Sequence, residues 1–381
     1  MIKLVNDTID KQDIENLRNW LKDMPRLTKG NLTIEFEKKF AAWQGSKYAV
    51  YVNSGSSANL LMLYALRTLK DKKNVIIAPA LSWVTTIAPI LQFGYDLILC
   101  DTEQGNLGLN IEHLKKLVKL YHPLAIVGVN VLGFPCNYID VLKLCSENNV
   151  LLLEDNCENI GSVYHGQKCG TFGTMSSFSF YFGHHISTIE GGMICTNNQS
   201  WYELLLQLRS HGWDRDLSAD KKAELRETWE VDDFQALFTF YEEGFNLRAT
   251  DLQAYIGIKQ IDKLDYIVKK RYENYLLYKS LIKDNWIFDD TGCVISNHAY
   301  PIIHAKKNEI VKALKENDIE CRPIAGGSME KQPFYIKRFG KTNNCLVANL
   351  IHELGFYVPN NQDITQAEIQ KICKIINKVI A

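Results

Sequence analysis

Two adjacent histidines, His184 and His185, follow an apolar run in the stretch SFSFYFGHHISTIEGG, residues 177–192. An imidazole titrates near neutral pH, so it can accept and then donate a proton, or it can bind a metal ion. Neighbouring side chains of an extended chain point to opposite faces, which disfavours one shared metal ion. The residues alone also allow a buried histidine with a purely structural role.

Three other stretches carry residues suited to binding an anion or a flat ring. In VNSGSSANLL, Gly55 and Ser56 lie in a turn before a predicted helix, and N–H groups at a helix start attract anions. Asp155 ends the run LLLED, where a carboxylate can pair with a protonated ring nitrogen. Trp83, in APALSWVTT, offers a stacking surface. Each stretch taken alone also fits an ordinary cap, turn or core position.

The elements that must position these residues form an alternating pattern between residues 48 and 196. Short runs rich in Val, Ile, Leu and Phe alternate with amphipathic stretches such as IEHLKKLVKLY. Uninterrupted apolar runs are typical of strands buried between layers of helices, so an α/β fold with a mostly parallel sheet is predicted. The predicted strands are KYAVYV, NVIIAPA, LILCD, PLAIVGVNVLG, VLLLED, SSFSFYF and GGMICTN.

The hydrophobic pattern of the sequence changes after about residue 200, where long helical patterns replace the alternation of strands and helices. WYELLLQLRSHG and the stretch from Thr250 to Ile282 distribute charges around apolar stripes, and short strand candidates and two more helices follow. A chain of 381 residues is long for one domain. We therefore expect a large α/β domain over residues 1–250 and a smaller α+β domain over residues 251–381.

Composition narrows the class of protein. The net charge is −1 at pH 7, which argues against a nucleic-acid or membrane-surface partner. The N-terminus lacks the features of a signal peptide, and no run of about 18 apolar residues predicts a membrane span. None of the ten cysteines forms a C-x-x-C pair, so we expect reduced thiols, a cytoplasmic location and no metal site.

Several motifs taken together resemble the sugar-nucleotide aminotransferases of the DegT/DnrJ/EryC1/StrS family. They include FEKKFAAWQGSKYAVYVNSGSSANLL, APALSWVTT, LLLEDNCENIG, GTFGTMSSFSFY, EGGMICTN, RSHGW, EEGFNLRATDLQAYIGIKQIDKL and IECRPI, and the similarity runs from about residue 20 to the C-terminus. The resemblance implies the fold-type I architecture of enzymes dependent on pyridoxal 5′-phosphate (PLP), acting on nucleotide-linked keto-sugars.

The resemblance also implies roles for individual residues. Gly55, Ser56 and Ser179 match positions that hold the cofactor phosphate, and Asp155 matches the acid paired with the pyridine nitrogen. The remaining implied positions are Glu158 near the ring hydroxyl, Trp83 over the ring, Asn246 reaching the phosphate from the neighbouring subunit of a homodimer, and Arg248 close to the site.

One departure from the family pattern changes the expected reaction. The aminotransferases carry a Lys-Asn pair where this chain has His184-His185, and imidazole cannot form a Schiff base with the cofactor. The cofactor would then be held without a covalent bond, which suits pyridoxamine 5′-phosphate (PMP). A branch of the family with this exchange consists of 3-dehydratases that make 3,6-dideoxy sugars, with His184 as acid and base and L-glutamate restoring PMP.

The expected substrate is a nucleotide-linked 4-keto-6-deoxy sugar, either GDP-4-keto-6-deoxymannose or a GDP-linked heptose. Residues 213–243 differ in residue composition from the motifs, so we expect them to select the substrate. Within them, Arg215 is either a contact to the nucleotide phosphate or a solvated arginine. The scattered cysteines predict no iron–sulfur cluster, because ligation needs four close thiolates. A sugar 4-aminotransferase and a non-catalytic binding protein are the alternatives.

Overall fold

A central sheet dominates the computed structural model, which describes residues 1–69 and 73–381. Within these residues the sheet has seven strands in the order β1-β9-β8-β5-β4-β2-β3. Their bounds are β1 Tyr48–Val52, β2 Val75–Pro79, β3 Asp96–Cys100, β4 Ala125–Val129, β5 Leu151–Asp155, β8 Met175–Ser179 and β9 Gly192–Thr196. Each one overlaps a predicted strand, and the mostly parallel α/β fold is confirmed.

Strand direction decides where functional side chains can meet. Strands β2, β3, β4, β5 and β8 pair in parallel, whereas β9 runs antiparallel to both β8 and β1. The carboxyl ends of β1, β2, β4, β5 and β8 therefore lie at one edge of the sheet. Loops at this edge form the usual binding site of open α/β sheets.

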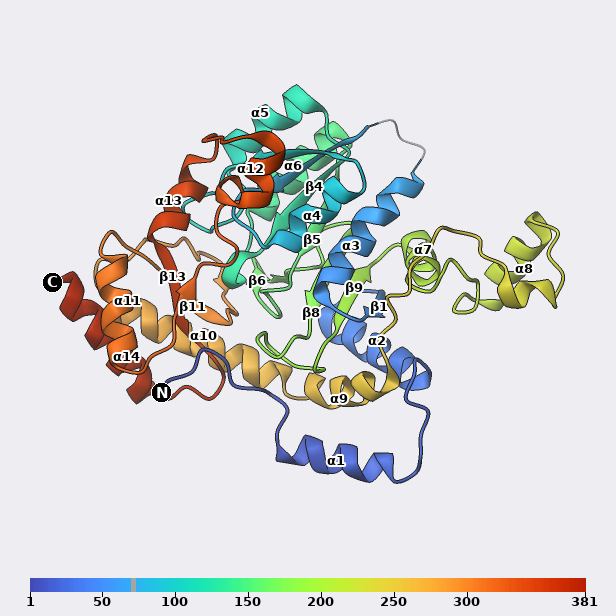
Figure 1. Cartoon of the computed structure of the whole chain (residues 1–381), viewed down its shortest axis with the longest axis horizontal. Coiled ribbons are helices and arrows are strands. Elements are labelled where there is room, and N and C mark those ends of the chain that lie inside the picture. Colours follow the sequence, from blue (N-terminus) through green and yellow to red (C-terminus); the bar gives the residue numbers. More distant parts are fainter. Residues whose placement is uncertain (70–72) are drawn as a thin grey trace.

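Helices cover both faces of the sheet, because alternate strand residues point to opposite sides (Figure 1). Ile77, Ile126 and Leu152 pack in one core with helices α5 (Ile111–Tyr121) and α6 (Tyr138–Asn148). Ile76, Val127 and Leu153 belong to a second core that includes side chains of α3 (Gly55–Ala65). A third core joins α2 (Asn31–Gln44) to aromatic residues of β1 and β8.

A second, three-stranded sheet lies toward the C-terminus. It has the order β11 (Ala299–Ile303), β13 (Gly355–Pro359) and β12 (Arg322–Pro323), and it is covered by α11 (Lys307–Glu316) and α14 (Gln366–Ile380) (Figure 1). The long helical stretch predicted from Thr250 to Ile282 is two helices, α9 (Asp251–Ile261) and α10 (Leu264–Leu281). The predicted domain division at residue 250 stays a prediction.

The remaining elements complete the chain. The other α-helices within residues 1–69 and 73–381 are α1 (Lys11–Leu21), α4 (Val84–Gln92), α7 (Gln199–Arg209), α8 (Ala219–Thr228), α12 (Pro333–Phe339) and α13 (Leu346–Leu354). A small sheet joins β10 (Cys293–Val294), β6 (Val163–Tyr164) and β7 (Gln167–Lys168). Helix α8 projects from the body of the molecule (Figure 1).

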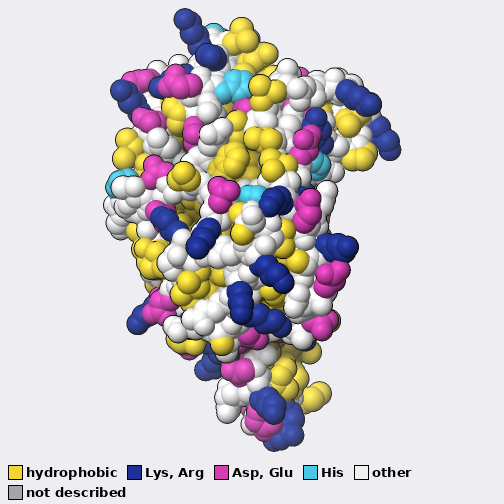
Figure 2. Space-filling view, turned by 90° about the vertical axis from the view of Figure 1, so that its left-hand side faces the viewer, with side chains coloured by type: hydrophobic (Ala, Val, Ile, Leu, Met, Phe, Trp, Pro, Cys, Tyr) yellow, Lys and Arg dark blue, Asp and Glu magenta, His cyan; other side chains and the backbone are white. Residues whose placement is uncertain are grey.

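The distribution of surface charge and the character of the helices were both compared with expectations from the composition. On the face shown in Figure 2, acidic and basic side chains are interspersed with hydrophobic ones, as the net charge of −1 suggests. Throughout residues 1–69 and 73–381, no helix combines the length and the apolar character that crossing a membrane requires.

Candidate active site

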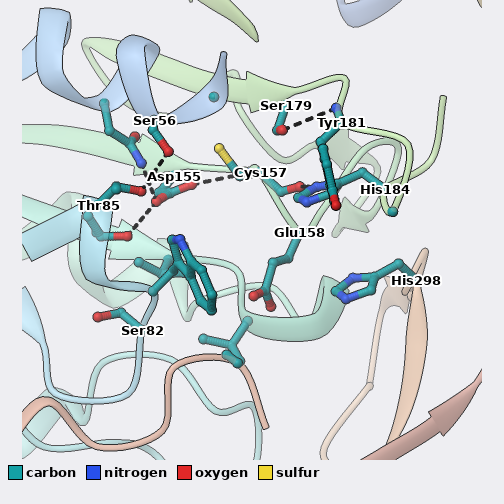
Figure 3. Close-up of a pocket in the computed structure, with 18 of the residues that line it drawn as sticks. Ser56, Ser82, Thr85, Asp155, Cys157, Glu158, Ser179, Tyr181, His184 and His298 are labelled. Carbon is teal, nitrogen blue, oxygen red and sulfur yellow. Dashed lines mark hydrogen bonds between the residues drawn. The ribbon is translucent and has the colours of Figure 1, made fainter. Parts of the chain in front are cut away.

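A cavity of about 350 Å³ opens at the edge of the sheet where the parallel strands end. It is lined by seven of the residues singled out from the sequence: Gly55, Ser56, Trp83, Asp155, Glu158, Ser179 and His184. They stand at the ends of β5 and β8 or in the segments that follow β1, β2, β5 and β8, so the fold gathers residues up to 129 positions apart in the chain (184 minus 55). Figure 3 shows most of them around one space.

Asp155, the last residue of β5, lies at the floor of this cavity and is only 4% exposed. Its Oδ2 accepts hydrogen bonds from the Asn59 amide and the Thr86 hydroxyl, both at 2.7 Å, and Oδ1 accepts the Cys157 N–H at 3.0 Å. All three donors are neutral. A carboxylate held this way keeps its negative charge available for a cation in the cavity.

The turn between β1 and α3 forms one wall of the cavity. Ser54 caps α3, since its side chain accepts the Ser57 N–H, and the helix starts at Gly55. A Cβ atom at Gly55 would lie 2.6 Å from Ser179 Cβ and 2.8 Å from Cys157 Sγ, so glycine alone allows this close approach. The approach places the hydroxyls of Ser56 and Ser179 on either side of a helix N-terminus, an arrangement suited to a phosphate.

Trp83 forms the opposite wall. It precedes α4 and leaves 54% of its surface exposed, although large aromatic side chains are usually well buried. Figure 3 labels its neighbour Ser82, which lies on the side of the cavity away from Ser179 and His184. The flat exposed indole therefore offers a surface on which a ring can stack.

His184 lies in a turn after β8, closed by a hydrogen bond from its N–H to the Tyr181 carbonyl at 2.9 Å. Its Nδ1 contacts the carbonyl oxygen of Cys157. A carbonyl only accepts, so Nδ1 carries the proton and Nε2 holds the free lone pair of the neutral ring. Burial lowers the pKa of His184, against smaller opposing effects of the Cys157 carbonyl and the Asp155 charge. Neutral His184 is thus a proton acceptor at Nε2.

His185 lies outside the cavity. It is fully buried, and its Nε2–H donates to the carbonyl of Ser296 at 2.9 Å, while burial holds its pKa well below the usual value. The expected strand geometry is wrong here, because β8 ends at Ser179 and does not continue to Phe182. The turn, and not strand alternation, separates the two imidazoles.

Glu158 and His298 complete this side of the cavity (Figure 3). Glu158 accepts the Leu132 N–H at 2.8 Å, and burial, reinforced by the charge of Asp155, raises its pKa to about 7. The ring of His298 is stacked on that of His184, with centroids 5.7 Å apart and planes inclined by 9°. Three titratable groups therefore meet beside the wall formed by β5 and β8.

Asn246, Arg248 and Arg215 do not line the cavity of their own chain. Arg248 Nε donates to Asn246 Oδ1 at 2.9 Å, and the backbone of Arg248 pairs with Val52 at the end of β1. Arg215 stacks on Trp213 at 3.7 Å and donates to the Leu237 carbonyl. The contribution expected of Asn246 in a neighbouring subunit stays a prediction.

Sequence reasoning missed several lining residues. Asn59 and Thr86 hold Asp155. They lie inside the quoted stretches VNSGSSANLL and APALSWVTT, three residues after Ser56 and Trp83, and this helical spacing was a usable signal. His298 and Arg322 come from the C-terminal sheet region, and Leu4 and Val5 come from the N-terminus. Arg322 stands in the quoted motif IECRPI, which gave it no role, and no local pattern marks the other three, because only the tertiary fold brings them to the cavity.

The donor set fits a pyridoxal-type cofactor. A buried carboxylate with neutral partners suits a protonated pyridine nitrogen, a helix N-terminus with serines suits a phosphate, and an exposed indole suits the ring. Throughout the described part of the chain, no lysine lines the cavity. In the same residues, no cluster of three or more His, Cys, Asp or Glu side chains is placed to hold a metal ion.

Comparisons with known proteins agree with this geometry. The model of the DegT/DnrJ/EryC1/StrS aminotransferase family matches residues 7–377. A GDP-4-keto-6-deoxy-D-mannose 3-dehydratase of Yersinia pseudotuberculosis is 34% identical over 98% of both chains. The corresponding E. coli enzyme, solved with bound hydrated PLP, superposes with a TM-score of 0.89 at 33% identity over 99% of both chains. Another structure of such a dehydratase, with a trapped PLP–glutamate geminal diamine, has a TM-score of 0.88 at 32% identity, covering 99% of this chain and all of the other.

Proposed function

This chain belongs to the DegT/DnrJ/EryC1/StrS aminotransferase family, and we propose that it removes a hydroxyl group where most of the family transfers an amine. It is a PLP- and PMP-dependent 3-dehydratase of a nucleotide-linked 4-keto-6-deoxy sugar. The substrate is GDP-4-keto-6-deoxymannose or a GDP-linked 6-deoxy-4-keto-heptose. The product is the 3,6-dideoxy-4-keto sugar.

The observation that carries the proposal is the side chain at the end of the β8 loop. His184 lines the cavity close to Asp155, where an aminotransferase needs a lysine, and no lysine lines the cavity in the described part of the chain. A chain without that lysine cannot hold the aldehyde form covalently. Non-covalent binding leaves the amine form free to react with a keto-sugar.

In the proposed mechanism, different residues bind the cofactor and transfer the proton. Asp155 holds the ring nitrogen, Gly55, Ser56 and Ser179 hold the phosphate, and Trp83 covers the ring. When bound, the aminated cofactor would supply an amine for the C4 ketone of the sugar and a ring able to store the electrons that displace the C3 hydroxyl. His184 Nε2 removes the proton from the cofactor carbon and returns it to the departing hydroxyl, while Nδ1 stays on the Cys157 carbonyl.

The proposed overall reaction consumes one L-glutamate for each sugar. Loss of the C3 hydroxyl is a two-electron reduction of the sugar, and oxidation of glutamate to 2-oxoglutarate and ammonia supplies those electrons. In support, a similar dehydratase was solved with a trapped PLP–glutamate geminal diamine. The enzyme thereby needs no external reductase, consistent with the predicted absence of an iron–sulfur cluster.

Product analysis tests this function directly. The enzyme is incubated with PLP, L-glutamate and GDP-4-keto-6-deoxymannose, and the sugar, 2-oxoglutarate and ammonia are quantified. The proposal expects a 3-deoxy-4-keto sugar with equal amounts of 2-oxoglutarate and ammonia. A 4-amino sugar without ammonia identifies an aminotransferase, and no turnover on GDP-, CDP- or dTDP-linked keto-sugars indicates a binding protein.

The same proposal includes a homodimer with shared active sites, located in the cytoplasm. The loop and helix over residues 213–243 expose several large apolar side chains that a second subunit would cover: Trp229, Phe234, Leu237, Phe238 and Phe240. Asn246 is exposed next to this segment. Exposed apolar clusters of this kind mark interaction surfaces, which supports assembly of two chains.

A further inference from the structure

Arg271, on helix α10, carries a buried charge without a carboxylate partner. Its side chain is 2% exposed, and no ion pair with an acid is formed among the described residues. Arg209 is equally buried but pairs with Glu37 at 2.5 Å and Asp216 at 3.0 Å. Burying an unpaired charge is costly, so the environment of Arg271 must compensate in another way.

The compensation comes from oxygen atoms on three separate segments. Nη2 donates to the carbonyl of His184 at 3.0 Å and to Gln362 Oε1 at 3.3 Å. Nη1 donates to the carbonyl of Asn360 at 2.8 Å and approaches that of Asn297 at 3.4 Å. One planar guanidinium thus ties the turn after β8 to the residues before β11 and after β13.

Two of these carbonyls belong to the backbone that carries the cavity imidazoles. One is the carbonyl of His184 itself, and the other belongs to Asn297, the residue before His298. The two rings are stacked 5.7 Å apart although their residues lie 114 positions apart in the chain (298 minus 184). We propose that Arg271 is a positioning residue that fixes the imidazoles of His184 and His298 relative to each other. This inference rests on the proposed function only for the catalytic use of His184.

The charge of Arg271 adds an electrostatic effect. It lowers the pKa of His184 and His298, in the same direction as burial, whereas Asp155 raises that of His184. Burial also lowers the pKa of Arg271 to about 9, so the guanidinium remains mainly charged near neutral pH. Several charged and titratable groups face the imidazoles or Arg271: Asp155 at the end of β5, Glu158 after it, Tyr181 and His185 near the turn, Arg322 on β12, Tyr357 on β13 and Asp363 after β13.

Two substitutions separate geometry from charge. Arg271→Met removes the charge and the hydrogen bonds, whereas Arg271→Lys keeps the charge but loses the planar fork. Single-turnover dehydration by PMP-loaded enzyme should fall about 100-fold in Arg271→Met and about tenfold in Arg271→Lys, because small displacements of reacting groups reduce rates by such factors. The KM for the sugar and the affinity for PMP should stay within about threefold. Arg209→Lys, a buried arginine outside the cavity, is the matched control and should keep its single-turnover rate.

A second measurement does not depend on turnover. In the cofactor-free protein labelled at histidine nitrogens, NMR titration follows His184, which His184→Asn assigns. Removing a nearby positive charge favours protonation, so the pKa of His184 should rise in Arg271→Met and stay unchanged in Arg271→Lys. The acid limb of the kcat/KM profile should move to higher pH in Arg271→Met alone, since only neutral His184 accepts a proton.

The outcomes distinguish this inference from the proposed function. Wild-type protein without dehydratase activity would refute the function, while the NMR titration would still test Arg271. An unchanged His184 titration together with near-normal turnover in Arg271→Met overturns the positioning role. Parallel loss of cofactor binding and rate in an Arg271→Met protein that circular dichroism shows to be folded also overturns it, because Arg271 would then support the whole site and not the two imidazoles. If Arg271→Met does not fold, Arg271→Lys decides: a wild-type rate contradicts the role and a tenfold loss supports it.

Discussion

At the scale of single residues, one hydrogen bond fixes how His184 holds its proton. The Cys157 carbonyl keeps the proton on Nδ1, and burial keeps the ring neutral, so Nε2 is ready to accept. Substitution by asparagine keeps a polar side chain in the cavity but removes the titratable nitrogen.

We therefore expect His184→Asn to lower the dehydration rate by at least about 100-fold, since general acid–base groups contribute factors of that size. Binding of PLP, followed by its absorbance in a titration, should remain close to that of wild type. His165→Asn is a matched control, because His165 is exposed and lies outside the cavity. Near-normal turnover of His184→Asn would remove the assigned role from this residue.

Glu158 gives a prediction about pH and stability. Burial raises its pKa to about 7 in the folded protein, above the ordinary value of 4.5, so the folded state binds a proton more tightly than the unfolded state. Ionisation above pH 5 is then more costly in the folded state, and this carboxyl progressively destabilises the protein up to about pH 7.

Glu158→Gln removes that cost while preserving the shape of the side chain. Relative to wild type, the cofactor-free variant should gain about 3 kcal/mol in unfolding free energy at pH 8 and less than about 1 kcal/mol at pH 5. Urea unfolding at the two pH values measures the difference. An equal effect of the substitution at both pH values would contradict a raised pKa.

At the scale of elements, the N-terminal segment acts as part of the cavity wall. Leu4 and Val5 line the cavity, and a backbone bridge from Ile2 to Ile319 holds the segment against the C-terminal region. The Leu4 N–H also donates to Glu320 at 2.8 Å. The cofactor contacts proposed within the same chain, in contrast, come from the ends of central strands and the turns that follow them.

Deleting residues 1–7 should therefore separate substrate binding from cofactor binding. Without the two apolar side chains of the wall, the free energy of binding the nucleotide sugar should weaken by about 1–2 kcal/mol, so kcat/KM for this substrate should fall about tenfold. PLP titration should give an unchanged affinity. Loss of PLP binding in the shortened protein would instead show that the segment supports the whole fold.

The difference between residues at strand ends and residues brought in from distant segments explains what the sequence could and could not predict. Strand ends such as Asp155 and turns such as Gly55-Ser56 have local signatures, because buried strands and helix starts require particular residue types. Leu4, His298 and Arg271 have none, since their roles depend on contacts with residues more than 80 positions away. The end of β8 was misplaced because Phe180 is as apolar and buried as a strand residue, although the chain already leaves the sheet there.

At the scale of the whole molecule, the proposed dimer makes each site depend on two chains. The cavity residues of one chain, including His184, would be completed by Asn246 of the other. The segment that carries Asn246 and Arg248 lies beside β1, but neither residue lines the cavity of its own chain. A shared site of this kind predicts that two inactive variants restore each other when they exchange subunits.

We expect this complementation between His184→Asn and Asn246→Ala, provided that Asn246→Ala alone is inactive. In a mixed dimer, one site combines an intact cavity with an intact Asn246, and the other site carries both defects. Random exchange makes half of the dimers mixed, with one active site of two, so about a quarter of wild-type activity should return.

The control for this experiment mixes His184→Asn with Asp155→Asn. Both residues line the cavity of the same chain, so every site in the mixed dimer keeps one defect and no activity should return. Subunit exchange is verified independently with differently tagged chains. Exchange without recovered activity in the first mixture would mean that Asn246 serves its own chain, and the shared-site arrangement would be wrong.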